Sequence, residues 1–327
     1  MTERDRLLRS IAAITADYRE GELAPPTPDH VDRWIRQFPT EVQQPILTEL
    51  EHVFGNTYFT KKNVTDFLSD LVTNENITKG DPAKFWRGVK FLNIQQAGNS
   101  QREMLEIFEK KLRKHCNLTI AECGTNPHTF LYLDDVLFTG GRIKHDITNW
   151  IRNDAPQVAN VAIVTIGYHL LGQWFTEKDL KKVIEETGKK ITFDWWKCIT
   201  IEDRKKYNYS SDVLRPTIIP DDEATQAYVN ELKQEQILRT PGSTGSNKFF
   251  SSEAGRSLLE QEFLKKGAYI RTICPYLTKY QRPLGNAILK TMGFGSMIVT
   301  FRNCPNNAPL ALWAGNPWYP LFARKTN

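Results

Sequence analysis

Two adjacent carboxylates, Asp134 and Asp135, follow an apolar and aromatic run over residues 130–133. The sequence Thr-Gly-Gly-Arg comes soon afterwards, at residues 139–142, and a polar stretch of helical character continues to residue 150. Glycine lets backbone amides approach an anion closely, and the N-terminus of a following helix attracts negative charge. Carboxylates accept hydrogen bonds from hydroxyl groups. These residues therefore predict binding of a phosphorylated sugar, with the phosphate in the 139–142 cradle and the hydroxyls on the two aspartates.

The apolar run before the acids must position them. A continuous apolar strand is typical of the interior of a parallel sheet, and open α/β sheets bind ligands at the carboxyl ends of their strands. A second buried strand is predicted over residues 158–167, followed by Tyr168 and His169. By topology we expect both side chains to face the same crevice, where Tyr168 is a candidate to stack on a base and His169 a candidate to donate to a phosphate or a base edge. Because aromatic residues at strand ends mostly pack against their neighbours, packing is the favoured interpretation.

A plainer interpretation of the same residues is a buried strand that ends in a solvated Asp-Asp turn and an ordinary glycine loop. Short motifs of this kind also occur by chance. We favour the site because the strand, the acid pair, the glycine turn and the helix occur in the required order.

The string Leu-Asp-Asp-Val-Leu-Phe-Thr-Gly-Gly, residues 133–141, resembles the phosphoribosyl-pyrophosphate (PRPP) signature of type I phosphoribosyltransferases. This resemblance implies that Asp134 and Asp135 are the catalytic pair, holding the ribose hydroxyls with Mg²⁺ nearby. It also implies a phosphate-binding loop made of Phe138, Thr139, Gly140, Gly141 and Arg142. The family usually has Ser or Thr where Arg142 stands. Arginine binds phosphate more strongly, but catalytic competence is no longer implied.

A strand candidate over residues 84–94 leads into a polar glycine turn and a helix over residues 101–115. In type I phosphoribosyltransferases the equivalent loop binds pyrophosphate through exposed amides, and the matching candidates here are Gly98, Asn99 and Ser100. A helix start capped by serine suits an anion. A plain capped connection explains the same residues equally well.

The connection into the central strand is short. A strand is predicted over residues 117–122, and only residues 123–128 separate it from the central strand. Active type I enzymes commonly carry a long mobile hood loop here, which closes over PRPP and excludes water. Shielding of the site must therefore come from elsewhere, or transferase chemistry is absent. We interpret His128, in the same connection, as a surface residue.

The N-terminal residues 1–80 predict a helical extension, with helices over residues 1–22, 29–38, 40–54 and 60–73. Residues 81–220 predict an α/β core, a phosphoribosyltransferase-like parallel sheet flanked by helices, with further strands over residues 191–201 and 212–219. Residues 221–327 predict an α+β region packed on the core. Its expected elements are helices over residues 221–238 and 251–266, the second ending at Gly267, a mobile lid over residues 239–248, and a strand over residues 297–301.

The C-terminal tail is rich in asparagine, proline and bulky aromatic residues. Asparagine and proline fix a loop conformation through side-chain hydrogen bonds and a restricted backbone. One interpretation is a structural clamp. The other is that polar side chains of the tail recognise the base or a partner; these are Arg302, Asn303, Asn306 and Asn307.

The composition describes an ordinary soluble globular protein of 327 residues, with 40% hydrophobic and 25% charged residues and a net charge of +5. The five cysteines are scattered without CxxC pairs, which argues against a disulfide framework or a zinc site. There is no signal-peptide core and no run of the ~20 apolar residues that a membrane span requires. We therefore expect a cytoplasmic protein with reduced thiols and no membrane partner.

Four segments together resemble a phosphoribosyltransferase-like family of bacterial conflict and phage-defence systems, some members of which accompany reverse transcriptases in retrons. The segments are residues 31–38, 95–100, 134–140 and 303–309. The resemblance implies an effector that uses PRPP or a related nucleotide. It also implies control by a defence-system protein or a ribonucleoprotein.

Three functions follow. The first is an enzyme that transfers or hydrolyses a glycosidic bond at C1 of ribose, with PRPP or a nucleotide as substrate and Mg²⁺ bridging pyrophosphate oxygens. The second is a catalytically inactive subunit that senses a nucleotide or scaffolds a complex, which Arg142 and the short hood connection favour. The third, direct nucleic-acid binding through the basic and aromatic turn at residues 203–209, ranks last because the chain has no dense Lys/Arg block.

Overall fold

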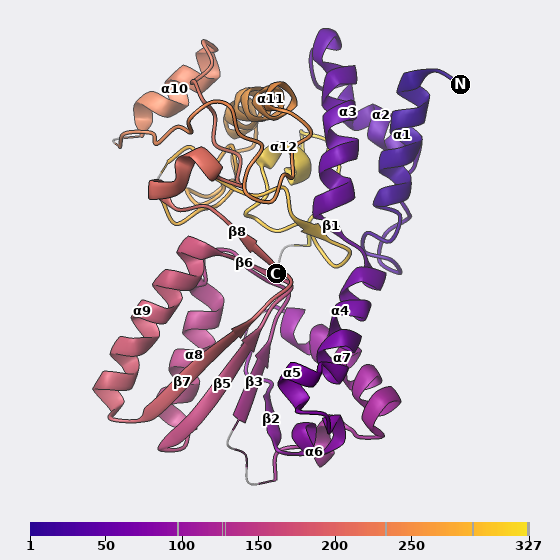
Figure 1. Ribbon diagram of the computed structural model, residues 1–327. Coiled ribbons are helices and arrows are strands. Elements are labelled where there is room, and N and C mark those ends of the chain that lie inside the picture. Colours follow the sequence, from indigo (N-terminus) through magenta and orange to yellow (C-terminus); the bar gives the residue numbers. More distant parts are fainter. Residues whose placement is uncertain (97, 126, 128, 233, 290, 326–327) are drawn as a thin grey trace. The chain divides into compact units, whose positions relative to one another are not determined.

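A computed structural model describes residues 1–96, 98–125, 127, 129–232, 234–289 and 291–325. The chain forms two compact units: residues 62–200, here called the α/β unit, and residues 1–61 with 201–326, here called the helical unit (Figure 1). The three-part division at residues 80 and 220 stays a prediction, and His128 lies outside the described residues.

The α/β unit alternates helices and strands. Its helices are α4 (Lys61–Thr73), α5 (Glu75–Thr78), α6 (Pro82–Arg87), α7 (Ser100–Cys116), α8 (Gly141–Asn153) and α9 (Leu170–Thr187). Its strands are β2 (Val89–Leu92), β3 (Thr129–Leu133), β4 (Val136–Leu137), β5 (Val158–Val164), β6 (Gly167–His169), β7 (Lys190–Trp196) and β8 (Ile199–Ile201). The predicted buried strand before the acids is confirmed as β3, of which residues 130–133 are buried.

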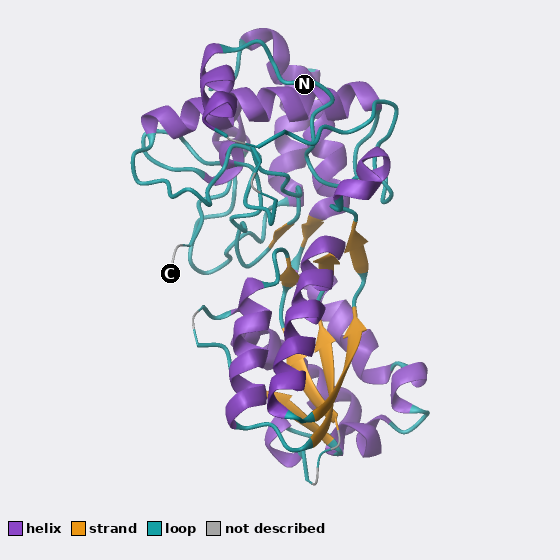
Figure 2. Cartoon of the chain, turned by 90° about the vertical axis from the view of Figure 1, so that its left-hand side faces the viewer, coloured by secondary structure: helices purple, strands orange, loops and turns teal. Residues whose placement is uncertain are grey.

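The larger sheet of this unit has four parallel strands in the order β2-β3-β5-β7. A smaller sheet, β4-β6-β8, continues three of these chain segments. Figure 2 shows helices on both sides of the strands. The mixed α/β class, with parallel sheets flanked by helices, is thus confirmed.

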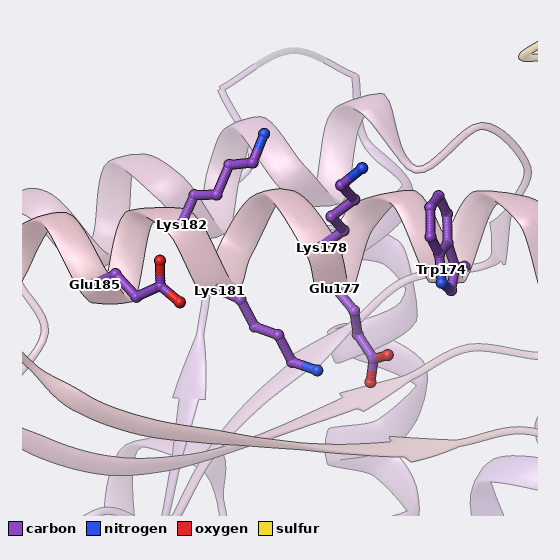
Figure 3. A pocket seen from close by; sticks show the side chains of 6 residues that line it. All are labelled: Trp174, Glu177, Lys178, Lys181, Lys182 and Glu185. Carbon is purple, nitrogen blue, oxygen red and sulfur yellow. The ribbon is translucent and has the colours of Figure 1, made fainter.

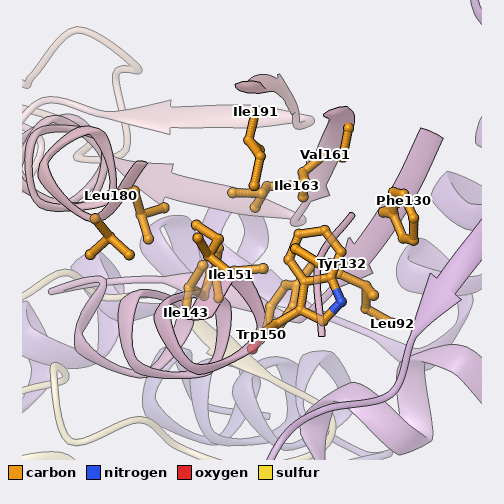
Figure 4. Packing of buried hydrophobic residues seen from close by; sticks show 14 of the residues in the cluster. Leu92, Phe130, Tyr132, Ile143, Trp150, Ile151, Val161, Ile163, Leu180 and Ile191 are labelled. Carbon is orange, nitrogen blue, oxygen red and sulfur yellow. The ribbon is translucent and has the colours of Figure 1, made fainter. Parts of the chain in front are cut away.

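Opposite faces of the larger sheet are covered by different helices. Tyr132 and Ile163 are paired in register and pack with apolar residues of α8 and α9 (Figure 4). On the other face, the ring of Phe91 lies 5.3 Å from that of Phe108 on α7. The covering helix therefore changes sides between β2 and β3. In open α/β sheets, ligands bind at the carboxyl ends of the strands at such a switch point.

Two predicted strands of this part of the chain are wrong in extent. Residues 158–167 form β5 and β6, with a break at Thr165 and Ile166, and residues 191–201 form β7 and β8, with a break at Lys197 and Cys198. The breaks coincide because the backbone amides of Cys198 and Ile199 both donate to the Ile166 carbonyl, at 3.0 and 3.2 Å. An apolar run alone does not reveal such a bend.

The predicted strand at residues 117–122 is also wrong, because residues 120–122 form a 3₁₀ turn. Glu122 accepts hydrogen bonds from the backbone amide of Thr119 at 2.7 Å and from its hydroxyl at 2.8 Å. This capping box satisfies backbone groups locally, in competition with pairing in a sheet.

The helical unit is built from the N-terminal and C-terminal parts of the chain. Its helices are α1 (Glu3–Ile14), α2 (Pro28–Ile35), α3 (Thr40–Thr57), α10 (Glu223–Glu231), α11 (Glu253–Ile273) and α12 (Leu310–Trp313), and β1 (Tyr58–Phe59) pairs with β9 (Val299–Thr300) in parallel. The buried Trp34 indole donates to the Ala311 carbonyl at 2.7 Å. The Phe38 ring lies 5.9 Å from both Phe263 and Trp318. The C-terminal aromatic residues therefore clamp the N-terminal helices.

Residues 212–219, predicted as a strand, are irregular, and residues 212–216 are buried. Their backbone groups find partners outside any ladder: the amide of Arg215 donates to Glu260 at 3.1 Å and that of Leu214 to the Gly295 carbonyl at 2.8 Å. The predicted lid over residues 239–248 gains no support. The buried Arg239 donates to Glu260 and Glu253, and the backbone amide of Asn247 donates to Asp212.

Among the described residues, no helix combines the length and the apolar character that crossing a bilayer demands.

The predicted end of a helix at Gly267 is wrong, because α11 continues to Ile273. Gly267 is instead required by close packing, since a Cβ atom there would lie 2.6 Å from Cα and from the carbonyl oxygen of Pro283.

We expect Gly267→Ala to lower the free energy of unfolding by about 1–3 kcal/mol, as overpacking does. Gly55→Ala is the matched control, because Gly55 also lies within a helix and a Cβ atom added there would meet no neighbouring side chain within 4 Å. It should stabilise the protein by about 0.5–1 kcal/mol through helix propensity. Urea denaturation measures the free energy of unfolding of both variants. A change in the same direction for both variants would contradict close packing at Gly267.

Candidate functional site

Asp134 and Asp135 lie at the bend between β3 and β4. The amide of Asp134 donates to the Val164 carbonyl at 3.0 Å, and the amide of Ile166 donates to the Asp135 carbonyl at 2.8 Å. These two bonds hold the acids against the break between β5 and β6. The acid pair is thus fixed by the backbone of two neighbouring strands, at the carboxyl end of the larger sheet.

Each carboxylate of the pair is oriented by the amide that follows it. The backbone N–H of Asp135 donates to Asp134 Oδ1 at 2.9 Å, and that of Val136 donates to Asp135 Oδ1 at 2.7 Å. The Asp134 side chain is buried, with 4% of the residue exposed, whereas Asp135 is half-buried. The more accessible acid is therefore Asp135.

The predicted phosphate loop enters helix α8. Gly140 is the N-cap residue with φ +73°, Gly141 is the first helical residue, and Arg142 is exposed in the first turn. The loop, including Phe138 and Thr139, precedes a helix of 13 residues, whose N-terminal amides suit an anion. These five consecutive residues form the entry to α8, and phosphate binding by them stays a prediction.

Helix α9 supports this loop through Gly172 and Thr176. Neither residue was among the predicted site residues. A Cβ atom at Gly172 would lie 2.0 Å from the Phe138 carbonyl oxygen, and one at Gly140 would lie 1.9 Å from Thr176 Oγ1. The His169 ring also packs edge-on against Phe138, at 5.4 Å between centroids. The loop therefore lies directly on the first turns of α9, where only glycine fits.

The predicted pyrophosphate loop precedes helix α7. Gly98 has φ +89°, Asn99 is the N-cap residue and Ser100 is the first helical residue. The expected serine cap is wrong, because the Ser100 hydroxyl accepts a hydrogen bond from the side-chain amide of Gln95 at 2.9 Å. Residue 97 of the loop lies outside the described residues.

Two glutamines shape that loop, and the sequence analysis did not single them out. Gln101 Oε1 accepts from the backbone amides of Ile94 and Gln95 at 2.7 and 2.9 Å, and Gln95 Oε1 accepts from the Gln101 amide at 3.1 Å. Gln101 is fully buried, and its Nε2 has no hydrogen-bond partner among the described residues. Side-chain amides here replace the backbone bonds that a turn would make.

Asp146 on α8 links this helix to β3 and to the loop after β2. Its carboxylate accepts a hydrogen bond from the Tyr132 hydroxyl of β3 at 2.8 Å and another from the backbone amide of Gln96, in the loop after β2. Burial raises the pKa of Asp146, although the Tyr132 bond and the charge of Arg142 oppose the rise. Burial also raises the pKa of Tyr132, so its hydroxyl stays a donor.

Tyr168 and His169 are both buried at the end of β6. The Tyr168 ring packs 5.9 Å from Trp195, and the ammonium of Lys197 lies 5.4 Å from its centroid. His169 lies beside the phosphate loop through Phe138. These contacts are those of the packing alternative, and base recognition by the two residues stays a prediction.

The remaining candidates, Arg302, Asn303 and Asn306, belong to the helical unit. Asn303 exchanges hydrogen bonds with the backbone of Lys325, at 3.0 and 2.9 Å, and the neighbouring Asn307 accepts from the Ser296 amide at 2.9 Å. The carbonyl of Asn306 accepts from the Asn286 amide at 2.8 Å. These contacts fit the clamp interpretation; recognition of a base or partner stays a prediction.

The acid pair fits Mg²⁺ only as a partial ligand set. Carboxylate oxygens are the ligands that Mg²⁺ prefers, and the ion usually takes one or two of them together with water and substrate phosphates. Among the described residues, no group of three or more His, Cys, Asp or Glu side chains could hold a metal. Two carboxylates are within the number that Mg²⁺ usually takes from a protein, and Mg²⁺ binding by Asp134 and Asp135 stays a prediction.

An open groove of about 340 Å³ lies elsewhere in the α/β unit, along α9 (Figure 3). Its lining residues are Trp174, Glu177, Lys178, Lys181, Lys182 and Glu185. None of them is a predicted site residue. The groove is lined by both lysines and glutamates, so its charge is mixed. In Figure 3, Lys178 and Lys182 point away from Lys181, Glu177 and Glu185.

We expect Asp146→Asn to cost about 1–3 kcal/mol of unfolding free energy, because an NH2 donor replaces one oxygen of a buried carboxyl group that accepts two hydrogen bonds. The pKa of Asp146 is raised in the folded chain, so the folded state keeps a proton that the unfolded state has lost. The stability that this group contributes therefore falls as the pH rises from the unfolded pKa, about 4, to the raised value.

Urea denaturation across pH 3 to 7 measures the free energy of unfolding of both proteins. The free energy of unfolding of the wild type, relative to that of Asp146→Asn, should fall as the pH rises through that window. Asp154→Asn is the control, because Asp154 is exposed at the C-cap of the same helix. A pH dependence shared by both variants would contradict the assignment to Asp146.

The model of the PRTase-CE family matches residues 31–324 of the chain. No curated protein matches the chain. No solved structure matches it either.

Proposed function

Because the chain belongs to the PRTase-CE family, a phosphoribosyltransferase-like family, we propose that its α/β unit binds PRPP or a related nucleotide and acts at C1 of the ribose phosphate. The observation that carries this proposal is the placement of the acid pair and the Gly140–Arg142 helix start at the carboxyl end of one sheet. The Gly98–Ser100 loop lies between α7 and β2, the strand that pairs with β3 in parallel.

Each part of the site has a distinct role in this proposal. Asp135, and Asp134 behind it, accept hydrogen bonds from the ribose 2- and 3-hydroxyls, since carboxylates are pure acceptors when ionised. The amides at the start of α8 and the Arg142 guanidinium hold the 5′-phosphate. Amides of the 98–100 loop hold the pyrophosphate. The reacting C1 atom then lies between two anion sites.

Catalysis in this arrangement is positioning together with charge stabilisation, and it needs no protein nucleophile. Breaking the bond at C1 leaves an oxocarbenium-like sugar and a negatively charged pyrophosphate. A bound Mg²⁺ would neutralise charge on the pyrophosphate oxygens. Asp134 and Asp135 fix the ribose, and their negative charge favours the positive sugar ring.

The second candidate is a subunit that binds the nucleotide without turning it over. Only residues 117–128 connect α7 with β3, and part of this connection is the 3₁₀ turn at residues 120–122. A segment of this length leaves little chain for a hood that closes over a ligand and excludes water. Arg142, in place of a small hydroxyl residue, strengthens phosphate binding without supplying chemistry.

A role in bacterial phage defence, as an effector controlled by a protein or ribonucleoprotein partner, is the wider part of the proposal. It rests on the four sequence segments given above. Either biochemical function is compatible with it, because an effector can deplete a nucleotide and a sensor can report one.

Thermal unfolding with PRPP and Mg²⁺ tests the ligand. A true ligand at a hundredfold excess over its Kd adds about 2.7 kcal/mol of apparent stability. We expect this gain for the wild type and its loss in Asp134→Asn and Asp135→Asn. Asp194→Asn is the control, because Asp194 is an exposed acid of β7 that bonds to Asn160 at 2.8 Å. No gain with PRPP or any nucleotide would rule out a ligand site of either kind.

Calorimetry of Arg142→Ser tests the phosphate contact. Loss of a charge-assisted hydrogen bond, worth about 1.5–3 kcal/mol, should weaken PRPP binding at least tenfold. Arg152→Ser is the matched control, since Arg152 is an exposed arginine of the same helix that pairs with Glu186 at 2.9 Å. Binding that is unchanged in Arg142→Ser would remove this residue from the site.

Release of pyrophosphate or free base separates the two candidate functions. The enzyme predicts Mg²⁺-dependent consumption of PRPP or a nucleotide at saturating concentration. Saturated binding with unchanged ligand supports the sensing subunit.

A further inference from the structure

The C-terminal fifth of the chain contains no acidic residue. Residues 263–327 hold nine basic residues and neither Asp nor Glu. The nine are Lys265, Lys266, Arg271, Lys279, Arg282, Lys290, Arg302, Arg324 and Lys325. Residues 1–262 hold all 38 acidic residues and the other 34 of the 43 basic ones, so they carry a net charge of −4. A modest total of +5 therefore conceals one strongly basic segment, here called the acid-free segment.

Two arginines of this segment are held by contacts that do not neutralise them. Arg271 donates to the carbonyls of Thr278 and Gln281, at 3.0 and 2.5 Å, and Arg324 donates to that of Cys304 at 3.1 Å. Carbonyl oxygens satisfy the donors but carry no net charge. Carboxylates from outside the segment pair with Lys265 and Lys325. The segment thus retains an excess of positive charge in the folded state.

Three tyrosines of the acid-free segment are exposed, although large hydrophobic side chains are otherwise mostly buried. Tyr269, Tyr276 and Tyr280 are 46%, 55% and 56% exposed. Tyr269 lies in the last turns of α11, and Tyr276 and Tyr280 follow the helix. Hydrogen bonds from Arg271 to the carbonyls of residues 278 and 281 hold this following segment against the helix end. The exposed rings are therefore gathered in one region of the helical unit.

Cations flank two of these rings. The ammonium of Lys266 lies 5.9 Å from the centroid of Tyr269, and that of Lys279 lies 5.3 Å from the centroid of Tyr280. Exposed aromatic rings together with lysines are the combination that binds single-stranded nucleic acid, in which bases stack on the rings and phosphates interact with the positive charge. A duplex would offer its backbone but no open base faces.

We propose that the acid-free segment, centred on Tyr269, Tyr276 and Tyr280, is a binding surface for single-stranded nucleic acid. An anionic membrane fits less well, because an interfacial helix exposes bulky apolar side chains, whereas the large hydrophobic residues exposed in the described part of this segment are tyrosines. An acidic protein would use the charge but leaves the three rings unexplained. The surface is independent of the PRPP site.

The helical unit offers a matched control at the turn of residues 203–209. Tyr209 is 55% exposed, close to the 56% of Tyr280, and Lys206 lies 5.6 Å from the Tyr207 ring. Here the acids are close by: Glu202 pairs with Arg204 at 2.5 Å. The double variants Lys279→Gln/Tyr280→Ala and Lys206→Gln/Tyr209→Ala each remove one charge and one exposed tyrosine. They differ in sequence context, because the turn at residues 203–209 contains Asp203 and follows Glu202, whereas residues 263–327 contain no acidic residue.

Fluorescence anisotropy of a labelled 20-nucleotide single strand, titrated with the full chain at 50 and 200 mM KCl, is the test. We expect Lys279→Gln/Tyr280→Ala to weaken binding at least tenfold, because a base stack and a phosphate contact are both lost. The control double variant should stay within twofold of the wild type. Tyr280→Phe should retain binding, since its ring still stacks. Lys279→Gln alone should lower the slope of log affinity against log salt by about 0.7.

Several results would overturn the proposal. One is that neither RNA nor DNA binds at 50 mM KCl. Another is that both double variants lose the same affinity for the oligonucleotide. A larger loss of affinity in the control variant would assign the surface to residues 203–209 instead. Displacement of the oligonucleotide by polyglutamate, or by phosphatidylserine vesicles, at equal charge concentration would assign the surface to an acidic protein or a membrane instead. Circular dichroism of each variant confirms that it is folded.

Discussion

The candidate site depends on one backbone constraint, the bend at which strands β3, β5 and β7 break at corresponding positions and continue as β4, β6 and β8. Buried amides and carbonyls must keep partners, and at the bend they find them between neighbours: the Ile166 amide bonds to the Asp135 carbonyl, and the Ile166 carbonyl accepts from Cys198 and Ile199. Because three chain segments bend together, the two acids have a fixed place at the edge of the larger sheet. A lone strand end would leave them in a mobile loop.

Close packing and one buried carboxylate complete the site. Glycines at positions 140 and 172 let the phosphate loop lie directly on α9, and Asp146 holds the loop after β2 to β3 and α8 through Gln96 and Tyr132. None of these groups needs to touch a ligand. They hold the starts of α7 and α8 in fixed positions, and pre-organised amides bind an anion without first being ordered.

The helical unit follows a different principle, because its core is made by distant parts of the chain. Trp34 and Phe38, near the N-terminus, pack with Phe263, Ala311 and Trp318. The buried aromatic rings of the tail thus have a structural task, and the exposed tyrosines of the acid-free segment do not share it. Within this one segment, the buried rings belong to the core and the exposed tyrosines belong to the proposed binding surface. The uneven distribution of acidic residues along the chain supports that proposal.

The sequence alone determined the parts of this protein that are local. The apolar run, the acid pair and the Gly-Gly helix start lie within residues 130–142, so their order can be read directly from the sequence. The family also follows from residues 31–324. Tertiary structure decided what depends on distant partners: the bend, the roles of Asp146 and Gln101, the missing strand at residues 117–122 and the helix through Gly267. A buried polar group or a glycine takes its role from the atoms packed against it, and those atoms come from elsewhere in the chain.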